Sequence, residues 1–153
     1  MATDAIDAMQ AIIGQTFSSD WVMVDQARID AFAAATGDHQ FIHTDPVAAA
    51  QTPFGGTVAH GFLSLSLMPM MIEQADIPRP DGMLMAVNYG CDTLRFLSPV
   101  RSGSRVRGHF KPLSIDLKRP GQFQQKTEFT LEIEGSEKPA LVAEWIGQLI
   151  FPA

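Results

Sequence analysis

The stretch from residue 58 to residue 74 constrains the fold of this chain more than any other part of the sequence. It is apolar almost all round, which is typical of a helix that is buried on most sides rather than laid on a surface. It is also too short, and too often interrupted by polar residues and Pro69, to span a bilayer. Pro69 should kink or shorten the helix. The rest of the chain is therefore expected to wrap around it.

The second half of the sequence predicts a sheet that could do this. Apolar and polar side chains alternate between residues 123 and 134, as in a half-buried antiparallel strand. The turn Arg119-Pro120-Gly121 joins this strand to the preceding one, whose alternation changes phase at Pro112. That phase change predicts a bulge or an edge position. Further strands are expected at residues 83–88, 93–97 and 140–151, which makes an α+β fold with a bent antiparallel sheet of about five strands.

Two shorter helices are expected before the buried one. Asp25 is a good N-cap for a helix that runs to Thr36 and ends at Gly37. Its core-facing side chains should be Ile29, Phe32, Ala33 and Thr36. Asp45 and Pro46 predict a second, short helix over residues 46–50. Residues 37–46 between them are expected to form a loop.

Length and cysteine content bound the domain count and the compartment. The chain has 153 residues, and at that length a single domain, residues 1–153, can bury a real core without disulfides or metals. Cys91 is the only cysteine, so no disulfide can form within the chain and a reducing, cytoplasmic location is expected. The first residues include acidic side chains where an export signal has basic ones, so no export signal is expected.

Charge is distributed unevenly along the chain. Residues 1–90 hold two basic and ten acidic side chains (net −8), residues 91–126 hold eight and two (+6), and residues 127–153 carry −4. The basic segment could bind a phosphorylated ligand, or strand alternation could simply place it on a solvated face. Nucleic acid is not an expected partner, because there is no overall basic excess and no interleaving of basic and aromatic residues.

The loop at residues 37–46 carries the candidate chemistry. Asp38 and His43 lie five residues apart where glycine and proline disfavour regular helix, so both side chains can turn toward one point. A carboxylate and an imidazole that converge on a water form a general acid and base pair, suited to adding or removing water across a double bond. Each residue alone has a plainer interpretation, because Asp38 could satisfy loop N–H groups and His43 could be a packed or surface histidine.

The segment that leads into the buried helix adds a candidate oxyanion site. Backbone N–H groups at a helix N-terminus are unpaired and the helix dipole is positive there, so they can stabilise an enolate oxygen. Gly61 would let a thioester carbonyl approach without a side chain in the way. His60 is expected to be structural. No metal site is expected, because the histidines and acids at 38–45 lack a His-Glu-x-x-His frame and support from cysteine.

Two motifs together resemble the MaoC-like dehydratase family, which includes the (R)-specific enoyl-CoA hydratases. They are residues 32–46 and residues 53–63, and the specific combination within them is the Asp38-x-x-x-x-His43 step with Ala59-His60-Gly61. The resemblance continues through Asn88-Tyr89-Gly90, Arg95-Phe96, Ser98-Pro99-Val100 and Gly103-Ser104, and it is greatest to the single-domain subgroup of the nodulation protein N type. This chain departs from the common pattern at His39-Gln40, where many hydratases have Asn-Pro, and at Pro69.

The resemblance implies a hot-dog fold, a homodimer and a reaction. Asp38 and His43 match the catalytic pair of the family, and the Gly61 N–H matches its oxyanion donor. The implied reaction is hydration of a trans-2-enoyl thioester to the (3R)-hydroxyacyl product, or the reverse dehydration, on CoA or an acyl carrier protein, with no cofactor. Two alternatives stay open, a hot-dog thioesterase and a non-catalytic acyl-thioester-binding or partner subunit.

Overall fold

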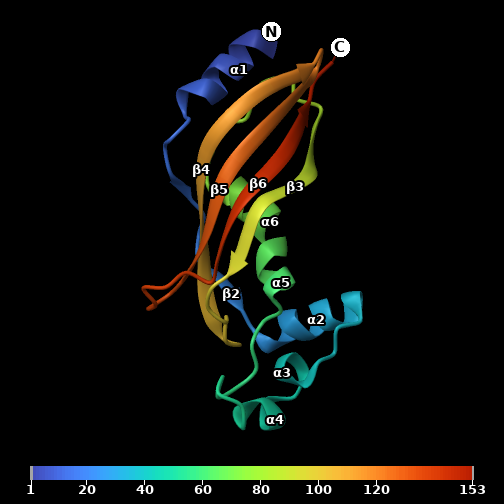
Figure 1. Cartoon of the computed structure of the whole chain (residues 1–153), viewed down its shortest axis with the longest axis vertical. Helices are drawn as coiled ribbons and strands as arrows, with labels where there is room; N and C mark the ends of the chain where they lie inside the picture. The colour runs from blue at the N-terminus through green and yellow to red at the C-terminus, as the bar shows by residue number, and fades with distance from the viewer. Residues whose placement is uncertain (1, 153) are drawn as a thin grey trace.

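The computed structural model describes residues 2–152 (Figure 1). The first half of the chain is mostly helical and the second half is mostly sheet, as the change of periodicity predicts. In chain order the elements are α1 (Ala2–Ala11), β1 (Phe17–Ser18), β2 (Val22–Val24), α2 (Gln26–Thr36), α3 (Phe41–Thr44), α4 (Pro46–Ala50), α5 (Gly61–Ser66), α6 (Met68–Gln74), β3 (Met85–Phe96), β4 (Ser104–Arg119), β5 (Gln122–Ile133) and β6 (Leu141–Ile150).

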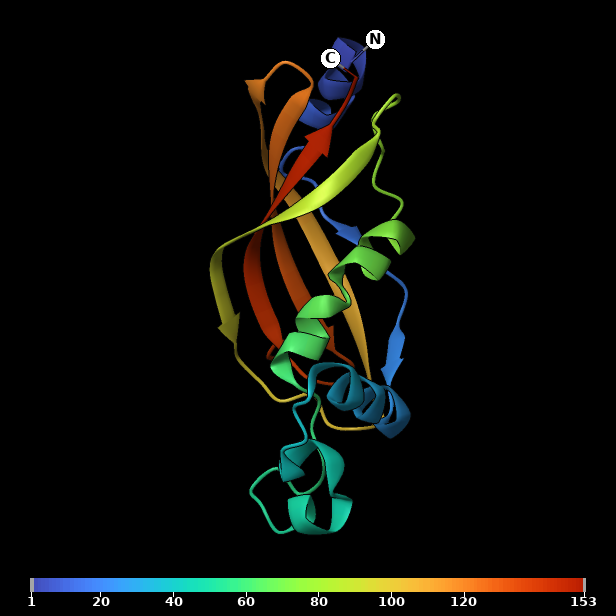
Figure 2. The ribbon, with the colours of Figure 1, turned by 90° about the vertical axis from the view of Figure 1, so that its right-hand side faces the viewer.

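The strands form one antiparallel sheet that bends around α5 and α6. Its order is β1-β4-β5-β6-β3, and the short β2 also pairs with β4. The two views show the long strands curving along one side of the two helices, with α2, α3 and α4 gathered at one end (Figures 1 and 2). The α+β prediction is confirmed, with six strands rather than about five, because β1 and β2 are too short to leave an alternating pattern.

The buried helix of residues 58–74 is two helices in the structure. α5 begins at Gly61 rather than at residue 58, because Val58 forms an isolated bridge with Arg101. α6 follows at Met68, and the break falls at Leu67, two residues before Pro69. Proline has no N–H to donate to the carbonyl four residues earlier, so the interruption expected from Pro69 is confirmed.

The strand predictions are confirmed in outline and corrected in detail. Residues 83–88 and 93–97 belong to one strand, β3, whose pairing with β6 shifts register twice between Asn88 and Thr93. Those shifts hid the continuity, because each one reverses the face on which the next side chains lie. The bulge expected at Pro112 is confirmed by a register shift between Pro112 and Ser114. β5 and β6 agree with the predicted segments within two residues.

The helix of residues 25–36 forms as predicted, with one error in its buried face. Asp25 accepts a hydrogen bond from the Arg28 N–H as N-cap, and Gly37 ends the helix in the left-handed conformation with φ 81°. Ile29 and Ala33 are fully buried, whereas Thr36 is exposed and bonds back to its own helix. The helix therefore meets the core with its first two turns only.

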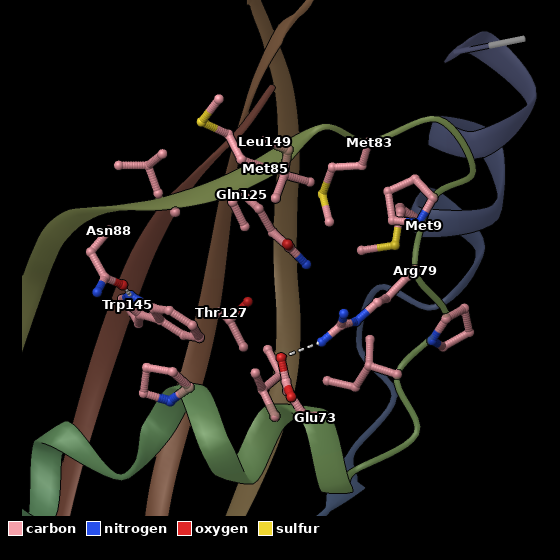
Figure 3. Close-up of a pocket in the computed structure, with 18 of the residues that line it drawn as sticks. Met9, Glu73, Arg79, Met83, Met85, Asn88, Gln125, Thr127, Trp145 and Leu149 are labelled. Atoms are coloured by element: carbon pink, nitrogen blue, oxygen red, sulfur yellow. Dashed lines mark hydrogen bonds and ion pairs between the residues drawn. The ribbon is translucent and has the colours of Figure 1, made fainter. Parts of the chain in front are cut away.

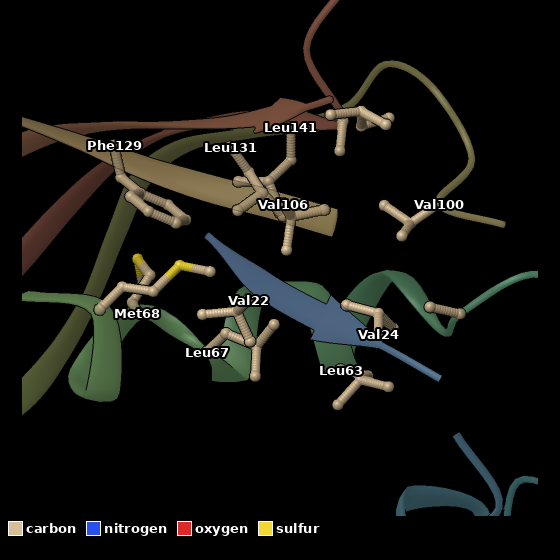
Figure 4. Packing of buried hydrophobic residues seen from close by; sticks show 14 of the residues in the cluster. Val22, Val24, Leu63, Leu67, Met68, Val100, Val106, Phe129, Leu131 and Leu141 are labelled. Carbon is tan, nitrogen blue, oxygen red and sulfur yellow. The ribbon is translucent and has the colours of Figure 1, made fainter. Parts of the chain in front are cut away.

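The main hydrophobic core lies between the two central helices and the inner face of the sheet (Figure 4). Leu63, Leu67 and Met68 of these helices face Val106 of β4 and the buried side chains of β5 and β6. A second cluster at the opposite end of the sheet from α2 packs α1 against the strands. It consists of Ile6, Met9, Ile12, Ile115, Leu149 and Phe151. None of the described helices has the length and apolar character needed to cross a bilayer.

Candidate active site

The structure brings Asp38 and His43 together at the end of α2. Gly37 turns the chain out of that helix, and His43 then lies on α3, a single turn of helix inside the segment expected to be a loop. One carboxylate oxygen of Asp38 and one ring nitrogen each of His43 and His60 lie within 4.8 Å of one another. Asp38 is exposed and accepts one hydrogen bond, from the Gln40 N–H at 3.2 Å. The two predicted residues therefore share one corner of the molecule.

Hydrogen bonding assigns the tautomer of His43. Its Nδ1 lies 2.6 Å from the carbonyl oxygen of Val58. A carbonyl can only accept, so Nδ1 carries the hydrogen of the neutral imidazole and Nε2 keeps its lone pair. The ring is 7% exposed, which holds it in one orientation. Nε2 is thus the nitrogen that can accept a proton.

His60 has a larger place in the site than the sequence indicated. Its ring stacks on His43, with centroids 3.8 Å apart and planes 24° apart. Its Nε2 donates to the carbonyl of Asp38 at 2.9 Å, and its Nδ1 is buried with no partner among the described residues. His60 therefore fixes the backbone of one predicted catalytic residue and the ring of the other. The sequence could not show this, because His60 and Asp38 are 22 residues apart.

Gln26 is a further residue that the sequence did not single out. Its amide nitrogen donates to the carbonyl of His43 at 2.7 Å, and its amide oxygen accepts from the Thr57 hydroxyl at 2.5 Å. Gln26 thereby connects α2, α3 and the segment that leads into α5. The Val58 N–H donates to the carbonyl of Ile42 at 3.0 Å and strengthens the same connection.

Gly61 lies beside this cluster as the first residue of α5. Its N–H has no acceptor among the residues that the structure describes, as expected for the first turn of a helix. A Cβ at this position would lie 2.9 Å from Cε1 of Phe96, whose ring also meets Phe62 edge to face. A side chain larger than hydrogen would therefore collide with Phe96.

Replacing Gly61 with alanine should lower the turnover number by up to about 100-fold, because relief of the collision would displace either Phe96 or the N–H donor. Adding Phe96→Ala should restore most of the lost activity. The matched control is Gly56→Ala, since a Cβ at Gly56 meets nothing within 4 Å. Steady-state kinetics of the three variants checks this, and a double variant as slow as Gly61→Ala would contradict the steric explanation.

Asp38, His43 and His60 also form the one cluster in the described chain with donors close enough for a metal ion. Its geometry is unfavourable for that purpose. Two histidines that bind one ion point their lone pairs at it from different directions, whereas these rings are stacked nearly parallel. The expectation that no metal is needed stays a prediction.

The basic segment of residues 91–126 is not a single positive patch. Arg105 pairs with Glu134, Arg107 with Glu132, and Lys126 with Asp92 and Glu144. The hydrogen bond from His109, and then Arg107, holds the pKa of Glu132 below its ordinary value. Arg105 and Arg107 alternate with the buried residues of β4, so they lie on the outer face of the sheet, away from α5 and α6.

Two other arginines of this segment, Arg101 and Arg95, donate hydrogen bonds to backbone carbonyls. Arg101 donates to the carbonyl of Phe54, in the segment before α5. Arg95 is exposed, and within the described residues its side chain bonds only to the neighbouring carbonyl of Leu94. It precedes Phe96, which contacts Gly61.

Comparison with known proteins identifies the family. The family described as MaoC like domain matches residues 8–133. The chain belongs to the MaoC-like dehydratase family. It is 46% identical over 144 residues to nodulation protein N of Rhizobium meliloti, a match that covers 93% of this chain and 89% of the relative. It is also 46% identical over 128 residues to 3-hydroxyacyl-thioester dehydratase Z of Mycobacterium tuberculosis, covering 84% and 83%.

Solved structures of the family agree with this assignment. An R-hydratase from Pseudomonas aeruginosa superposes with a TM-score of 0.68 at 26% identity, covering 92% of this chain and 81% of that one. The MaoC-like chain thus has the hot-dog fold expected from the resemblance. The family is one of hydratases and dehydratases, so this member is an enzyme of the hydro-lyase class.

Proposed function

We propose that this MaoC-like enzyme hydrates trans-2-enoyl-CoA to (3R)-hydroxyacyl-CoA, or catalyses the reverse dehydration. The observation that carries the proposal is the convergence of the Asp38 carboxylate and the His43 imidazole at the end of α2, beside His60, whose next residue, Gly61, begins α5. An acceptor pair for a water proton and a donor for an oxyanion are the groups that this addition requires. The name of the Mycobacterium tuberculosis relative supports a thioester substrate.

The proposed mechanism places a water between Asp38 and His43 and the thioester oxygen at the Gly61 N–H. The water oxygen bonds to C3 while the pair removes one of its protons, and a proton is delivered to C2. The electrons of the double bond pass through an enolate, whose oxygen the Gly61 N–H stabilises. His43 presents Nε2 to the water because Nδ1 is committed to Val58. The addition of water involves no net oxidation or reduction, so the proposed reaction needs no cofactor.

Incubation with crotonyl-CoA tests the proposal. We expect loss of the absorbance of the enoyl-thioester with no release of free thiol. Release of free thiol would instead support a thioesterase, which directs water to the carbonyl. Absence of both reactions, with ligand binding retained, would support a non-catalytic subunit. The same assay with an enoyl-acyl-carrier protein as substrate would show whether the acyl carrier is CoA or a carrier protein.

The cytoplasm is the proposed location, because a chain with a single cysteine is typical of a reducing compartment.

Arg95 is proposed to contact the phosphates of CoA. It is the exposed cation next to Phe96 that makes no ion pair in the described chain. Replacing Arg95 with glutamate should raise the Michaelis constant about tenfold, the value of a charged hydrogen bond, with little change in turnover number. It should also weaken the dependence of that constant on salt. Lys118→Glu, at the far end of β4, is the control, and equal behaviour of the two variants would contradict the contact.

A homodimer joined through β3 is the proposed assembly. β3 is an edge strand that pairs only with β6, and its side chains are exposed along nearly its whole length. Large apolar side chains are prominent among them: Met85, Val87, Tyr89 and Phe96. An exposed apolar edge of this length is a template for pairing with another strand. A second copy of the chain would cover it by continuing the sheet.

Replacing Tyr89, which is 68% exposed, with lysine should convert the dimer to monomer. The lysine would place a charge in the proposed interface, where burying it without a partner is unfavourable. Met23→Lys is the matched control, because Met23 is exposed at the opposite edge of the sheet, on β2. Sedimentation equilibrium measures the mass, and a wild-type chain that sediments as a monomer would overturn the proposed assembly.

A further inference from the structure

A cavity of about 440 Å³ lies beyond the candidate active site, between α6, the α6–β3 connection and the inner face of the sheet (Figure 3). Sites for small molecules occupy roughly 300–1,000 Å³, so the cavity can hold part of a ligand. Its walls are mostly apolar, and α1 contributes Met9 to them. Met83 lies on the same side of the close-up as Met9, and Met85 lines the cavity as well. Methionine side chains adapt easily to the shape of what they contact.

A second pocket shares lining residues with this cavity and reaches Phe62, the residue after Gly61. Phe62 lines the second pocket together with Leu65 of the same helix. Three residues line both pockets: Pro69, Asn88 and Trp145. The path from the proposed oxyanion donor to the cavity therefore runs along α5 and past Pro69.

The length of this path sets which acyl chains can enter the cavity. At 1.5 Å of rise per residue, counted along α5 and α6 as if the break at Leu67 continued the helix, Pro69 lies at most about 12 Å and Glu73 at most about 18 Å beyond Gly61. An extended chain covers roughly 1.2 Å per bond. An acyl chain whose carbonyl is at the Gly61 N–H thus needs about ten bonds to reach the near end of the cavity and about fifteen to reach the far end. A crotonyl group does not enter it.

Two polar side chains in the cavity wall lack partners. Gln125 and Thr127 lie two residues apart on β5, so both face the cavity, where they appear in the close-up (Figure 3). Neither side chain makes a hydrogen bond to any other residue in the described part of the chain, although Thr127 is only 3% exposed. A purely alkyl ligand would exclude water from them and leave them unpaired, which is unfavourable.

The charged residues at the cavity are already neutralised. Arg79 pairs with Glu73 at 2.8 Å, and both residues line the cavity. Among the described lining residues no other side chain carries a charge. A ligand group that reaches the wall is therefore better neutral than ionised.

We propose that the cavity receives the distal end of an acyl chain of more than about ten carbons that carries a neutral oxygen substituent such as a hydroxyl. Gln125 and Thr127 hydrogen-bond to that substituent. The inference rests on the proposed hydration reaction, because the Gly61 N–H fixes the other end of the chain. It narrows the substrate to a long, oxygenated enoyl thioester.

The test compares three substrates with the full-length enzyme: crotonyl-CoA, trans-2-tetradecenoyl-CoA and 14-hydroxy-trans-2-tetradecenoyl-CoA. We expect the hydroxylated substrate to have a kcat/KM at least tenfold above that of the plain long chain. Thr127→Val and Gln125→Leu keep the shape of each side chain and remove its hydrogen-bonding atoms. Together they should abolish that preference and leave the rate on crotonyl-CoA unchanged.

Two further variants distinguish an effect on kcat/KM that acts through the cavity from one that acts through the sheet as a whole. Ile72→Trp, at a half-buried lining position on α6, should fill the cavity and lower kcat/KM at least tenfold for both long substrates but not for crotonyl-CoA. Thr130→Val is the matched control for Thr127→Val, because Thr130 lies on the opposite face of the same strand. It should change none of the three rates.

The results distinguish a failure of this inference from a failure of the proposed function. Hydration of crotonyl-CoA without hydration of either long chain would overturn the inference and leave the proposed function standing. Equal kcat/KM for the two long substrates, unaffected by Thr127→Val and Gln125→Leu, would also overturn it. Inactivity on all three substrates, in a folded protein, would overturn the proposed function and the inference with it.

Discussion

Replacing Asp38 with asparagine should lower the rate of crotonyl-CoA hydration by at least about two orders of magnitude, the usual size of a general acid or base contribution. The carboxylate is one of the two groups proposed to hold the water, and an amide neither accepts nor delivers the proton at neutral pH. The fold should be retained, because the amide oxygen of asparagine can still accept the hydrogen bond from the Gln40 N–H.

Asp45→Asn is the matched control for this variant. Asp45 lies seven residues downstream and caps α4 through the Val47 and Ala48 N–H groups. Asparagine serves as an N-cap as well as aspartate does, so neither stability nor activity should change appreciably. A near-normal rate for Asp38→Asn, with an unchanged melting temperature, would remove Asp38 from the mechanism.

Replacing His43 with glutamine should have an effect of similar size, again at least about 100-fold on the turnover number. The variant loses Nε2, the ring nitrogen left free to accept a proton, while the glutamine amide can still donate to the Val58 carbonyl. Because the ring is buried against His60, the free energy of unfolding should also fall, by about 1–3 kcal/mol. Thermal unfolding measures that loss, so that inactivity from unfolding is distinguished from lost chemistry.

His39→Gln is the control for His43→Gln, because His39 is exposed and its ring makes no hydrogen bond in the described chain. The double variant Asp38→Asn, His43→Gln gives a further check. If both side chains act on one water, the double variant should be hardly slower than the slower single variant, since groups that act as a unit are strongly non-additive. Multiplication of the two effects would show that they act in separate steps.

Much of the fold is determined by neighbours along the sequence. The capping of α2 by Asp25 and Gly37, the start of α4 at Asp45, and the break before Pro69 each depend on residues within one helical turn. The strand β5 follows from alternation alone. The spacing of Asp38 and His43 likewise suffices to bring the two side chains together, because one short turn of helix separates them.

The continuity of β3 is a case that local patterns cannot decide. Its two register shifts reverse the alternation, so the sequence reads as two strands, and only pairing with β6 shows that it is one. Local patterns likewise do not reveal which acidic residues pair with the basic segment. Arg107 looks free in sequence, yet its acidic partner Glu132 lies on the neighbouring strand β5, 25 residues away.

The sequence by itself determined the α+β class, the buried helical segment with its interruption near Pro69, and the pairing of Asp38 with His43 as candidate catalytic residues. These depend on periodicity, capping and short spacing, which are properties of adjacent residues. The tertiary structure decided that His60 holds both Asp38 and His43, and that Gln125 and Thr127 face a cavity that α1 helps to enclose. Such contacts join residues tens of positions apart, and only the packing of helix against sheet fixes which of them meet.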